Sequence, residues 1–140
     1  MHIDHVGLAV KSLEEAIALW EQVFGYQQYT EIVVNKKQKV KVVFLKKKDS
    51  ITIKLIEPTD ETSPIYGLCK RGGGLHHLCF KCDSIDAELE RLTDSGLRVL
   101  APPQAGEAFE NERIAFLFAK NGLNIELIDT DKRAKIISGG

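Results

Sequence analysis

The chain has 140 residues, which is the usual size of a single domain and enough to bury an apolar core without disulfides. A formal net charge of -1 gives no large electrostatic field, so neither nucleic acid nor an acidic membrane surface is an expected partner. No segment has the pattern of a signal peptide or of a membrane span, and the three cysteines are an odd number. We therefore expect one cytoplasmic domain with reduced thiols.

The first 58 residues predict a strand, a helix and three further strands. Residues 2 to 10 are mainly apolar with a polar interruption at Asp4 and His5, which is typical of a buried strand. Ser12 is a candidate N-cap, and apolar residues follow it at helical spacing, so a helix is expected to run to about Gly25. Three strands separated by turn residues are then predicted near Gln27 to Val34, Lys39 to Lys46 and Ser50 to Pro58.

The later part of the chain predicts the same order of elements. Residues 59–73 form the linker, with a short helix expected after Pro64. The second set comprises a strand from Gly74 to Cys82, a helix capped by Ser84, and strands near Arg98, Glu112 to Ala119 and Leu123 to Asp129. Asn121 and Gly122 predict a hairpin turn, and residues 131–140 are expected to form a flexible tail.

The two sets of elements are related by an internal repeat. Aligning IDHVGLAVKSLEEAIALW with LHHLCFKCDSIDAELERL places His5 opposite His77 at an offset of 72 positions. The same offset aligns FLKKKDSITIKLIEP with FLFAKNGLNIELIDT without a gap. The chain is therefore predicted to be an α+β domain of two βαβββ modules, 1–58 and 74–130, related by a pseudo-twofold axis.

Four polar residues lie at equivalent positions of strands that are otherwise apolar: His5 and His77, and Lys54 and Glu126. An unpaired polar group there would be costly, so these side chains need partners. Two imidazoles and a carboxylate are suitable ligands for zinc, nickel, cobalt, manganese or ferrous iron. The alternative is structural, since a strand histidine is more often a hydrogen-bonded core residue and Glu126 could belong to a salt bridge.

Several segments resemble the vicinal oxygen chelate superfamily, which contains the glyoxalases, bleomycin resistance proteins and dioxygenases. These segments are IDHVGLAV with its following helix, GGGLHHLCF and NIEL, and EPTDETSPI followed by KRGGGLHH is most similar to the methylmalonyl-CoA epimerases. The resemblance implies a single glyoxalase-like domain over residues 1–130, in which a curved half-barrel sheet has its helices outside. It also implies one divalent metal ion held by His5, His77 and Glu126, a small-molecule substrate and a homodimer.

Lys54 departs from the family pattern, which has Glu or Gln as a fourth ligand at this position. An ammonium cannot bind a metal ion, and at about 4 Å it would be repelled by a divalent ion by about 8 kcal/mol at an effective dielectric of 20. Lys54 could be neutral, could turn away from a His5, His77 and Glu126 triad, or could take the place of the ion and pair with Glu126.

These alternatives give different functions. The leading hypothesis is a metal-dependent isomerase or lyase of the glyoxalase and epimerase type, which acts on a small carbonyl or thioester through a metal-stabilised enolate, with Lys54 taking part in catalysis. A metal-free binding protein in which Lys54 pairs with Glu126 is one rival. A ferrous oxygenase with a two-histidine, one-carboxylate triad is the other. No counterpart of the epimerase's acid/base glutamate is found, because VKVVFLKKK offers only lysines.

Overall fold

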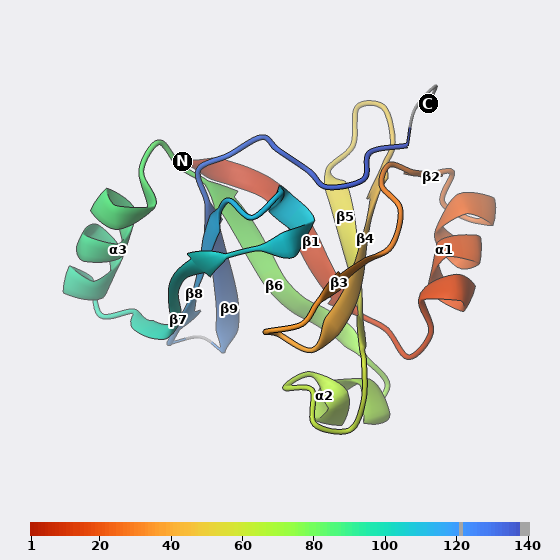
Figure 1. The fold of residues 1–140 in the computed structure, drawn as a ribbon, viewed down its shortest axis with the longest axis horizontal. Coiled ribbons are helices and arrows are strands. Elements are labelled where there is room, and N and C mark those ends of the chain that lie inside the picture. The colour runs from red at the N-terminus through yellow and green to blue at the C-terminus, as the bar shows by residue number, and fades with distance from the viewer. Residues whose placement is uncertain (121, 138–140) are drawn as a thin grey trace.

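The computed structural model describes residues 1–120 and 122–137, and has a single curved sheet with helices outside it (Figure 1). The elements in chain order are β1 His2–Ala9, α1 Leu13–Gln22, β2 Gln27–Gln28, β3 Val33–Asn35, β4 Val40–Lys46, β5 Thr52–Pro58, α2 Tyr66–Lys70, β6 Gly74–Lys81, α3 Ile85–Asp94, β7 Arg98–Ala105, the 3-10 helix η1 Glu107–Phe109, β8 Arg113–Ala119 and β9 Leu123–Ile128. The predicted α+β class is confirmed.

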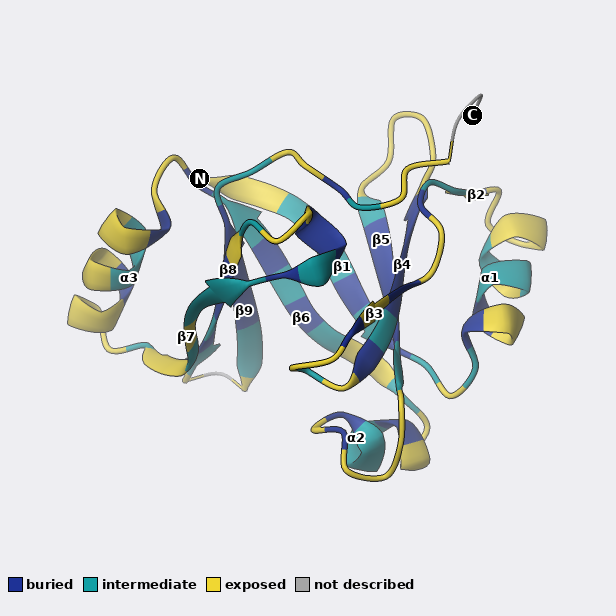
Figure 2. Cartoon of the chain, viewed as in Figure 1, coloured by how far each residue is buried: buried dark blue, intermediate teal, exposed yellow. Residues whose placement is uncertain are grey.

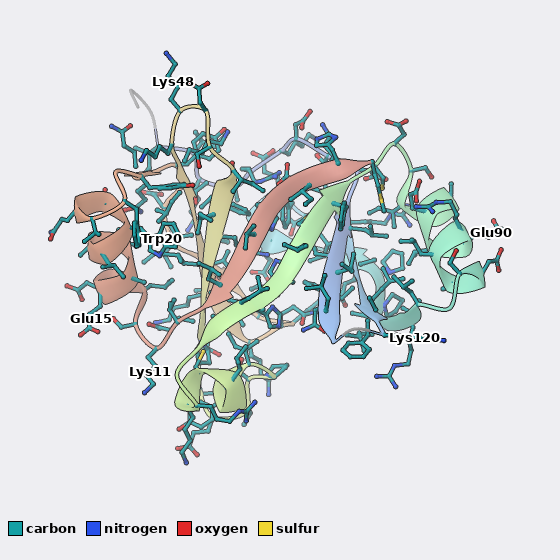
Figure 3. All side chains as sticks on the ribbon, turned by 180° about the vertical axis from the view of Figure 1, so that it is seen from behind. Lys11, Glu15, Trp20, Lys48, Glu90 and Lys120 are labelled. Carbon is teal, nitrogen blue, oxygen red and sulfur yellow. The ribbon has the colours of Figure 1, made fainter. Side chains whose placement is uncertain are left out.

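The sheet consists of two halves with the same internal order. Its strands run β2-β4-β5-β1-β6-β9-β8-β7, and β3 also pairs with β4. The halves are joined where β1 pairs with β6 antiparallel, and these two strands cross the middle of the molecule (Figure 3). Each first strand pairs in parallel with the last strand of its own module, β1 with β5 and β6 with β9, whereas the other pairs are antiparallel. The prediction of two βαβββ modules in a mixed, mainly antiparallel sheet is therefore confirmed.

The strand register repeats along with the strand order. Gly7 lies opposite Lys54 in the first module, and Cys79 lies opposite Glu126 in the second. In the same way, β4 places Phe44 opposite Lys54, and β8 places Phe116 opposite Glu126. All of these pairs follow the 72-residue offset, so the repeat seen in the sequence holds for individual residue positions in the sheet.

The two faces of the sheet have separate cores. On the outer face, α1 covers one apolar cluster that includes Leu45 and Leu55, and α3 covers another that includes Leu117 and Leu127. Figure 2 shows α1 and α3 at opposite ends, with their outward turns exposed. The inner, concave face has a third cluster, to which both modules contribute. The concave face is therefore where side chains from the two halves meet.

The beginning of each long helix is fixed in the same way in both modules. The hydroxyl of Ser12 accepts a hydrogen bond from the Glu15 amide in α1, and the hydroxyl of Ser84 accepts one from Ala87 in α3. A carboxylate from the last strand region adds a second acceptor, because Glu57 binds the Leu13 amide. Its counterpart, 72 positions on, is Asp129, which binds the Ile85 amide. Glu57 thus faces away from Lys54, as strand alternation predicts.

The strand predicted from Gln27 to Val34 is divided into β2 and β3, so that prediction was wrong in its continuity. Between them, the buried Thr30 uses its side-chain oxygen to accept a hydrogen bond from the Phe44 amide. Thr30 also forms an isolated bridge to Ile136. The regular ladder with β4 is therefore interrupted at Thr30, which contacts Phe44 of β4 on one side and the C-terminal segment on the other.

The C-terminal segment packs on the domain over residues 131–137, although a flexible tail was expected. Backbone hydrogen bonds join Ala134 to Ala108, Glu31 to Lys135 and Ile137 to Tyr29. Residues 138–140 and Asn121, which belongs to the predicted hairpin turn, lie outside the described residues. Among the helices that the structure describes, none is long and apolar enough to cross a membrane.

Candidate metal centre

The four polar strand residues named from the sequence converge on the concave side of the sheet. His5 lies on β1, Lys54 on β5, His77 on β6 and Glu126 on β9, which are the four central strands. All four are buried, and Glu126 and His5 have no exposed surface. The pseudo-twofold arrangement brings them together because the first and last strands of each module lie beside the junction of the halves.

Glu126 is the centre of this cluster. Its Oε1 atom lies 3.0 Å from the Nε2 atom of His5 and 3.0 Å from that of His77. The two Nε2 atoms are 3.4 Å apart. Each close contact between an imidazole nitrogen and a carboxylate oxygen requires either a proton on the nitrogen or a cation shared by both atoms. The site is therefore built to surround positive charge.

The residue preceding each histidine holds the other nitrogen of its ring. Nδ1 of His5 lies 2.7 Å from the Oδ2 atom of Asp4, and Nδ1 of His77 lies 2.8 Å from Nδ1 of His76. Asp4 and His76 are themselves equivalent by the 72-residue offset. Partners of this kind fix the ring orientation and the tautomer of a histidine that binds metal through its other nitrogen.

Burial and neighbouring charges set the protonation of these groups. Burial lowers the pKa of His77 to about 3, because the charged imidazolium loses its hydration. Burial and the charge of Lys54 lower the pKa of His76 to about 4. Burial alone would raise the pKa of Glu126, but the Lys54 ammonium and the two imidazoles hold it well below its usual value. At neutral pH, Glu126 is a carboxylate and His77 is neutral, which are the forms that bind metal.

Gly7 supplies the space that His77 occupies. A Cβ atom added at Gly7 would lie 2.1 Å from Cε1 of the His77 ring, far inside van der Waals contact. The equivalent position in the second module is Cys79, which is buried beside His5. Only the first module therefore needs a glycine here, and the glycine allows the imidazole to reach Glu126.

Lys54 points into the same cluster rather than away from it. Its Nζ atom lies 3.3 Å from Oε2 and 3.5 Å from Oε1 of Glu126. The ammonium also lies near two aromatic rings, 5.3 Å from the centre of Phe109 and 5.8 Å from that of Phe44. Of the three arrangements considered for Lys54, the contacts correspond to the one in which it pairs with Glu126.

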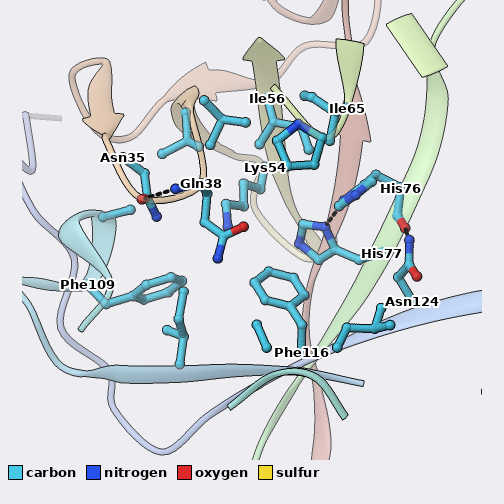
Figure 4. Close-up of a pocket in the computed structure, with 17 residues that line it drawn as sticks. Asn35, Gln38, Lys54, Ile56, Ile65, His76, His77, Phe109, Phe116 and Asn124 are labelled. Carbon is cyan, nitrogen blue, oxygen red and sulfur yellow. Dashed lines mark hydrogen bonds between the residues drawn. The ribbon is translucent and has the colours of Figure 1, made fainter. Parts of the chain in front are cut away.

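A mainly apolar cavity of about 270 Å³ opens beside the cluster (Figure 4). Lys54 and His77 form part of its wall, together with Phe109 and Phe116. The other lining residues are Asn35, Gln38, Val40, Val42, Ile56, Pro64, Ile65, His76, Leu100, Ala101, Ala108, Ile114 and Asn124. A small ligand could therefore reach the cluster through an apolar space with few polar groups.

Four residues around the site were not predicted. Asp4 and His76 had a usable signal, because both precede a candidate ligand at the same offset. Phe109 comes from η1, which no periodic pattern indicated. Arg133 lies in the segment expected to be a flexible tail, yet it is buried and binds Asp4. Contacts of this last type depend on tertiary structure, so the sequence pattern carries no trace of them.

The three donors fit a divalent ion in chemical type and spacing. Ligand atoms around a tetrahedral ion with bonds of about 2.0 Å are separated by about 3.3 Å, and the donor atoms of His5, His77 and Glu126 are 3.0 to 3.4 Å apart. The fourth place is different, because an ammonium contacts the same carboxylate. Lys54 must therefore move before an ion can bind without strong repulsion.

Comparison with protein families and known sequences gives consistent matches. Residues 4–116 match the family model described as the glyoxalase/bleomycin resistance protein/dioxygenase superfamily. The uncharacterized protein YqjC of Bacillus subtilis (strain 168) is 34% identical over 131 residues, which cover 91% of each chain. The ethylmalonyl-CoA/methylmalonyl-CoA epimerase of Cereibacter sphaeroides is 31% identical over 132 residues, covering 89% of this chain and 95% of the relative.

Solved structures agree with these matches. Methylmalonyl-CoA epimerase from Mycobacterium tuberculosis superposes with a TM-score of 0.80 at 33% identity, covering 91% of this chain and 87% of the other. A methylmalonyl-CoA epimerase in complex with methylmalonyl-CoA and NH4+ superposes with a TM-score of 0.81 at 32% identity, covering 93% and 94%. The likeness therefore extends over nearly the whole of both chains.

Proposed function

The chain belongs to the glyoxalase/bleomycin resistance protein/dioxygenase superfamily, and on that basis we propose that it is an isomerase of the epimerase type. Its substrate would be a small carbonyl or thioester compound bound in the cavity beside Glu126. The observation that carries the proposal is the convergence of two histidines and one glutamate, from three of the four central strands, beside an apolar cavity that His77 lines. A positive charge held by such a cluster can stabilise an enolate, which is the intermediate that such a reaction needs.

The relatives support this reaction class. Two that match over nearly their full lengths are named as epimerases of acyl-CoA thioesters. A cavity of about 270 Å³ with mostly apolar walls has room for a short acyl group. The larger coenzyme A part of such a thioester would extend through the cavity opening. Methylmalonyl-CoA is therefore the first compound to test, and shorter thioesters of branched acids come next.

A divalent ion would be held by His5, His77 and Glu126. When bound, such an ion supplies a Lewis acid that polarises a substrate carbonyl and stabilises the enolate charge. The chain's own contribution is to keep the donors fixed, since Asp4 holds the ring of His5 and His76 holds that of His77. The apolar lining excludes water and strengthens every electrostatic contact within the cavity.

Lys54 would act on the substrate directly. Its ammonium has three donor hydrogens and lines the cavity, so it can bind a carbonyl oxygen, next to Glu126 in the metal-free form or after moving away from Glu126 when an ion is bound. The other titratable groups in the cavity wall are His76 and His77, and His77 is engaged with Glu126. Lys54 is therefore the group that we assign to charge stabilisation or proton transfer at the substrate.

A second candidate is a metal-free pocket, and a specific contact favours it. The ammonium of Lys54 lies 3.3 Å from Glu126, so the carboxylate already has a compensating charge. Among the residues that the structure describes, no buried side-chain nitrogen or oxygen atom lacks a hydrogen-bond partner. In this form the protein would bind a carbonyl compound, or turn it over, with Lys54 as the resident cation.

Calorimetric titration of cobalt into the apo protein distinguishes the two candidates. If Lys54 moves aside, the wild type binds one ion per chain, Glu126→Ala abolishes binding and Lys54→Ala preserves it. If Lys54 replaces the ion, the wild type binds weakly, and Lys54→Glu creates tight binding by adding an oxygen ligand. Lys41→Ala is a matched control, because Lys41 is half-exposed and pairs with Glu57 outside the cavity.

Exchange of a substrate proton tests the reaction itself. Methylmalonyl-CoA incubated with the protein in D2O should gain deuterium at the carbon between its two carbonyl groups, and Lys54→Ala should slow this exchange. The metal-free binding candidate predicts a shift in the protein's NMR spectrum with no exchange above the rate without protein. Absence of both exchange and binding, with every thioester tried, would contradict the proposed function.

A further inference from the structure

The C-terminal segment of residues 131–137, called here the C-terminal strap, crosses the concave side of the sheet from the end of β9 to the region of β2 (Figure 1). Its backbone is held at both ends. The Ala134 amide donates to Ala108, next to the cavity residue Phe109. The Ile137 amide donates to Tyr29, and Thr30 forms a bridge with Ile136. The strap therefore links the second module to the first and lies outside the residues 4–116 that match the family model.

One side chain of the strap reaches the site. Arg133 is buried, with 8% of its surface exposed, and arginine is rarely buried unless its charge is paired. Its Nη2 atom donates a hydrogen bond of 2.6 Å to Oδ2 of Asp4. The guanidinium also lies 4.6 Å from the ring centre of Phe109 and 5.0 Å from that of Phe44. These are the same two rings that Lys54 approaches, so both cations pack around one aromatic pair.

Asp4 connects Arg133 to His5. The same Oδ2 atom that accepts from Arg133 lies 2.7 Å from Nδ1 of His5. Asp4 is paired with a guanidinium at 2.6 Å, an arrangement that matches an ionised carboxylate. An ionised carboxylate only accepts hydrogen bonds, so Nδ1 of His5 carries the hydrogen. The other nitrogen, Nε2, faces Oε1 of Glu126 at 3.0 Å, so it also carries a hydrogen when no cation is bound, and its position is suited to bind an ion when one is present.

We propose that Arg133 is a positioning residue, which fixes the ring orientation and tautomer of His5 through Asp4 and so couples the C-terminal strap to the site. The inference rests on the proposed function to the extent that both concern the same site. Among the described residues of the second module, the corresponding partner is different, since His77 is held by His76. Residues that fix a ligand through its second nitrogen commonly change metal affinity by tenfold or more when they are removed.

Nitrogen NMR of the histidine side chains tests this directly and needs neither substrate nor metal. In the wild type, two-bond proton–nitrogen correlations should show His5 as one species with hydrogen on Nδ1. Arg133→Met keeps an apolar side chain over the rings but removes the charge and the donors, so Asp4 is released and the His5 signals should shift away from the form with hydrogen on Nδ1. Lys132→Met is the matched control, because Lys132 is the adjacent strap residue, exposed and paired with Glu112.

Asp4, the middle residue of the Arg133–Asp4–His5 contacts, provides an independent variant. Asp4→Ala removes the carboxylate itself, and it should change the His5 signals in the same direction as Arg133→Met. If Arg133→Met does not fold, Asp4→Ala and Arg133→Lys, which keeps the charge and should restore much of the wild-type pattern, decide the question. Unchanged His5 signals in Arg133→Met or Asp4→Ala, or an equal change in Lys132→Met, would overturn the proposal.

Cobalt affinity gives a second readout that separates the two proposals. If the wild type binds cobalt, Arg133→Met should bind it about tenfold more weakly, whereas Lys132→Met should bind it equally well. Equal affinity in Arg133→Met would contradict a positioning role. If the wild type binds no cobalt, the metal-dependent form of the proposed function fails, and the NMR experiment still decides whether Arg133 positions His5.

Discussion

The two modules place different chemistry at equivalent positions. Lys54 and Glu126 have the same register against the first strand of their modules, and each is opposite a phenylalanine of the neighbouring strand. His5 and His77 also repeat, and each packs edge-on against the phenylalanine of its own module, Phe44 or Phe116 in turn. The duplicated backbone therefore fixes where side chains meet, and the substitutions decide what the meeting point can bind.

The differences between the modules concern charge. The first module contributes Asp4 and Lys54 where the second contributes His76 and Glu126. Each of the two acidic groups is therefore matched by a cation from elsewhere, Arg133 for Asp4 and Lys54 for Glu126. A symmetric pair of carboxylates would attract a divalent ion more strongly. Lys54, in place of a second carboxylate, therefore weakens the attraction of the cluster for such an ion.

Removing one partner of the central pair should have the largest effect on stability. Glu126→Ala leaves the Lys54 ammonium buried without its carboxylate, and breaking a buried pair in this way costs about 3 to 5 kcal/mol in the free energy of unfolding. Lys54→Leu with Glu126→Leu should recover most of that loss, because neither charge remains. Urea denaturation measures both. If Glu126→Ala were nearly neutral, the two equivalent positions would not be coupled as the contacts indicate.

Replacement of Gly7 by a larger residue should destabilise the protein, because the ring of His77 occupies the space beside it. Gly7→Ala places a methyl group against the ring of His77, so the imidazole must move away from Glu126. Overpacking of this kind costs about 1 to 3 kcal/mol. Gly67→Ala is the control, because the added atom meets only the end of the Arg71 side chain at 3.2 Å. Thermal unfolding gives the stability, and the His77 NMR signals show whether its ring has moved.

Much of the fold could be predicted because the repeat constrains it twice. An element missed in one module could be checked in the other, and the four cluster residues followed from the offset together with the strand assignment. The buried hydrophobic pattern of β1 and β6 also marked their polar residues as exceptions. Such exceptions are informative because an unpaired polar group in a sheet core is costly.

The parts that could not be predicted involve contacts between segments without a repeat. Arg133 and Phe109 have no counterpart in the first module, and each reaches the site by packing against distant strands. The interruption of the predicted strand at Thr30 also involves a distant segment, since Thr30 forms a bridge with the strap. Local propensity and periodicity describe one segment at a time, so they miss structure that depends on a second segment.

The free energy of unfolding should depend on pH through His76 in a different pH range than through its counterpart Asp4. Burial and Lys54 lower the pKa of His76 to about 4 in the folded protein, whereas an unfolded histidine titrates near 6.5. The unfolded chain therefore takes up a proton first, and stability is lost as pH falls from about 6.5 toward 4. Because His76 is partly exposed, solvent screens its neighbours, and we expect about 1 to 2 kcal/mol from this residue.

His76→Asn should remove that part of the loss, which urea denaturation at several pH values would show. The control is Asp4→Asn, because the lowered pKa of Asp4 contributes only at more acidic pH, where stability falls as its carboxylate is protonated. If the slope between pH 6.5 and 4 were the same in wild type and His76→Asn, the neutral buried state assigned to His76 would be wrong.

The smallest expected effect is a test of equivalence at the helix caps. Ser12 and Ser84 have nearly the same backbone conformation, with φ of -141° and -148°, and each hydroxyl accepts one amide hydrogen bond, at 3.2 and 3.3 Å. Replacing either with alanine should cost about 1 kcal/mol in the free energy of unfolding. Because Glu57 and Asp129 provide the same additional acceptor, the two losses should agree within about 0.5 kcal/mol. Ser12→Asp and Ser84→Asp should retain stability, since aspartate also caps a helix. A much larger loss in one module would show that its helix depends on the serine alone, and that the modules differ outside the site as well as within it.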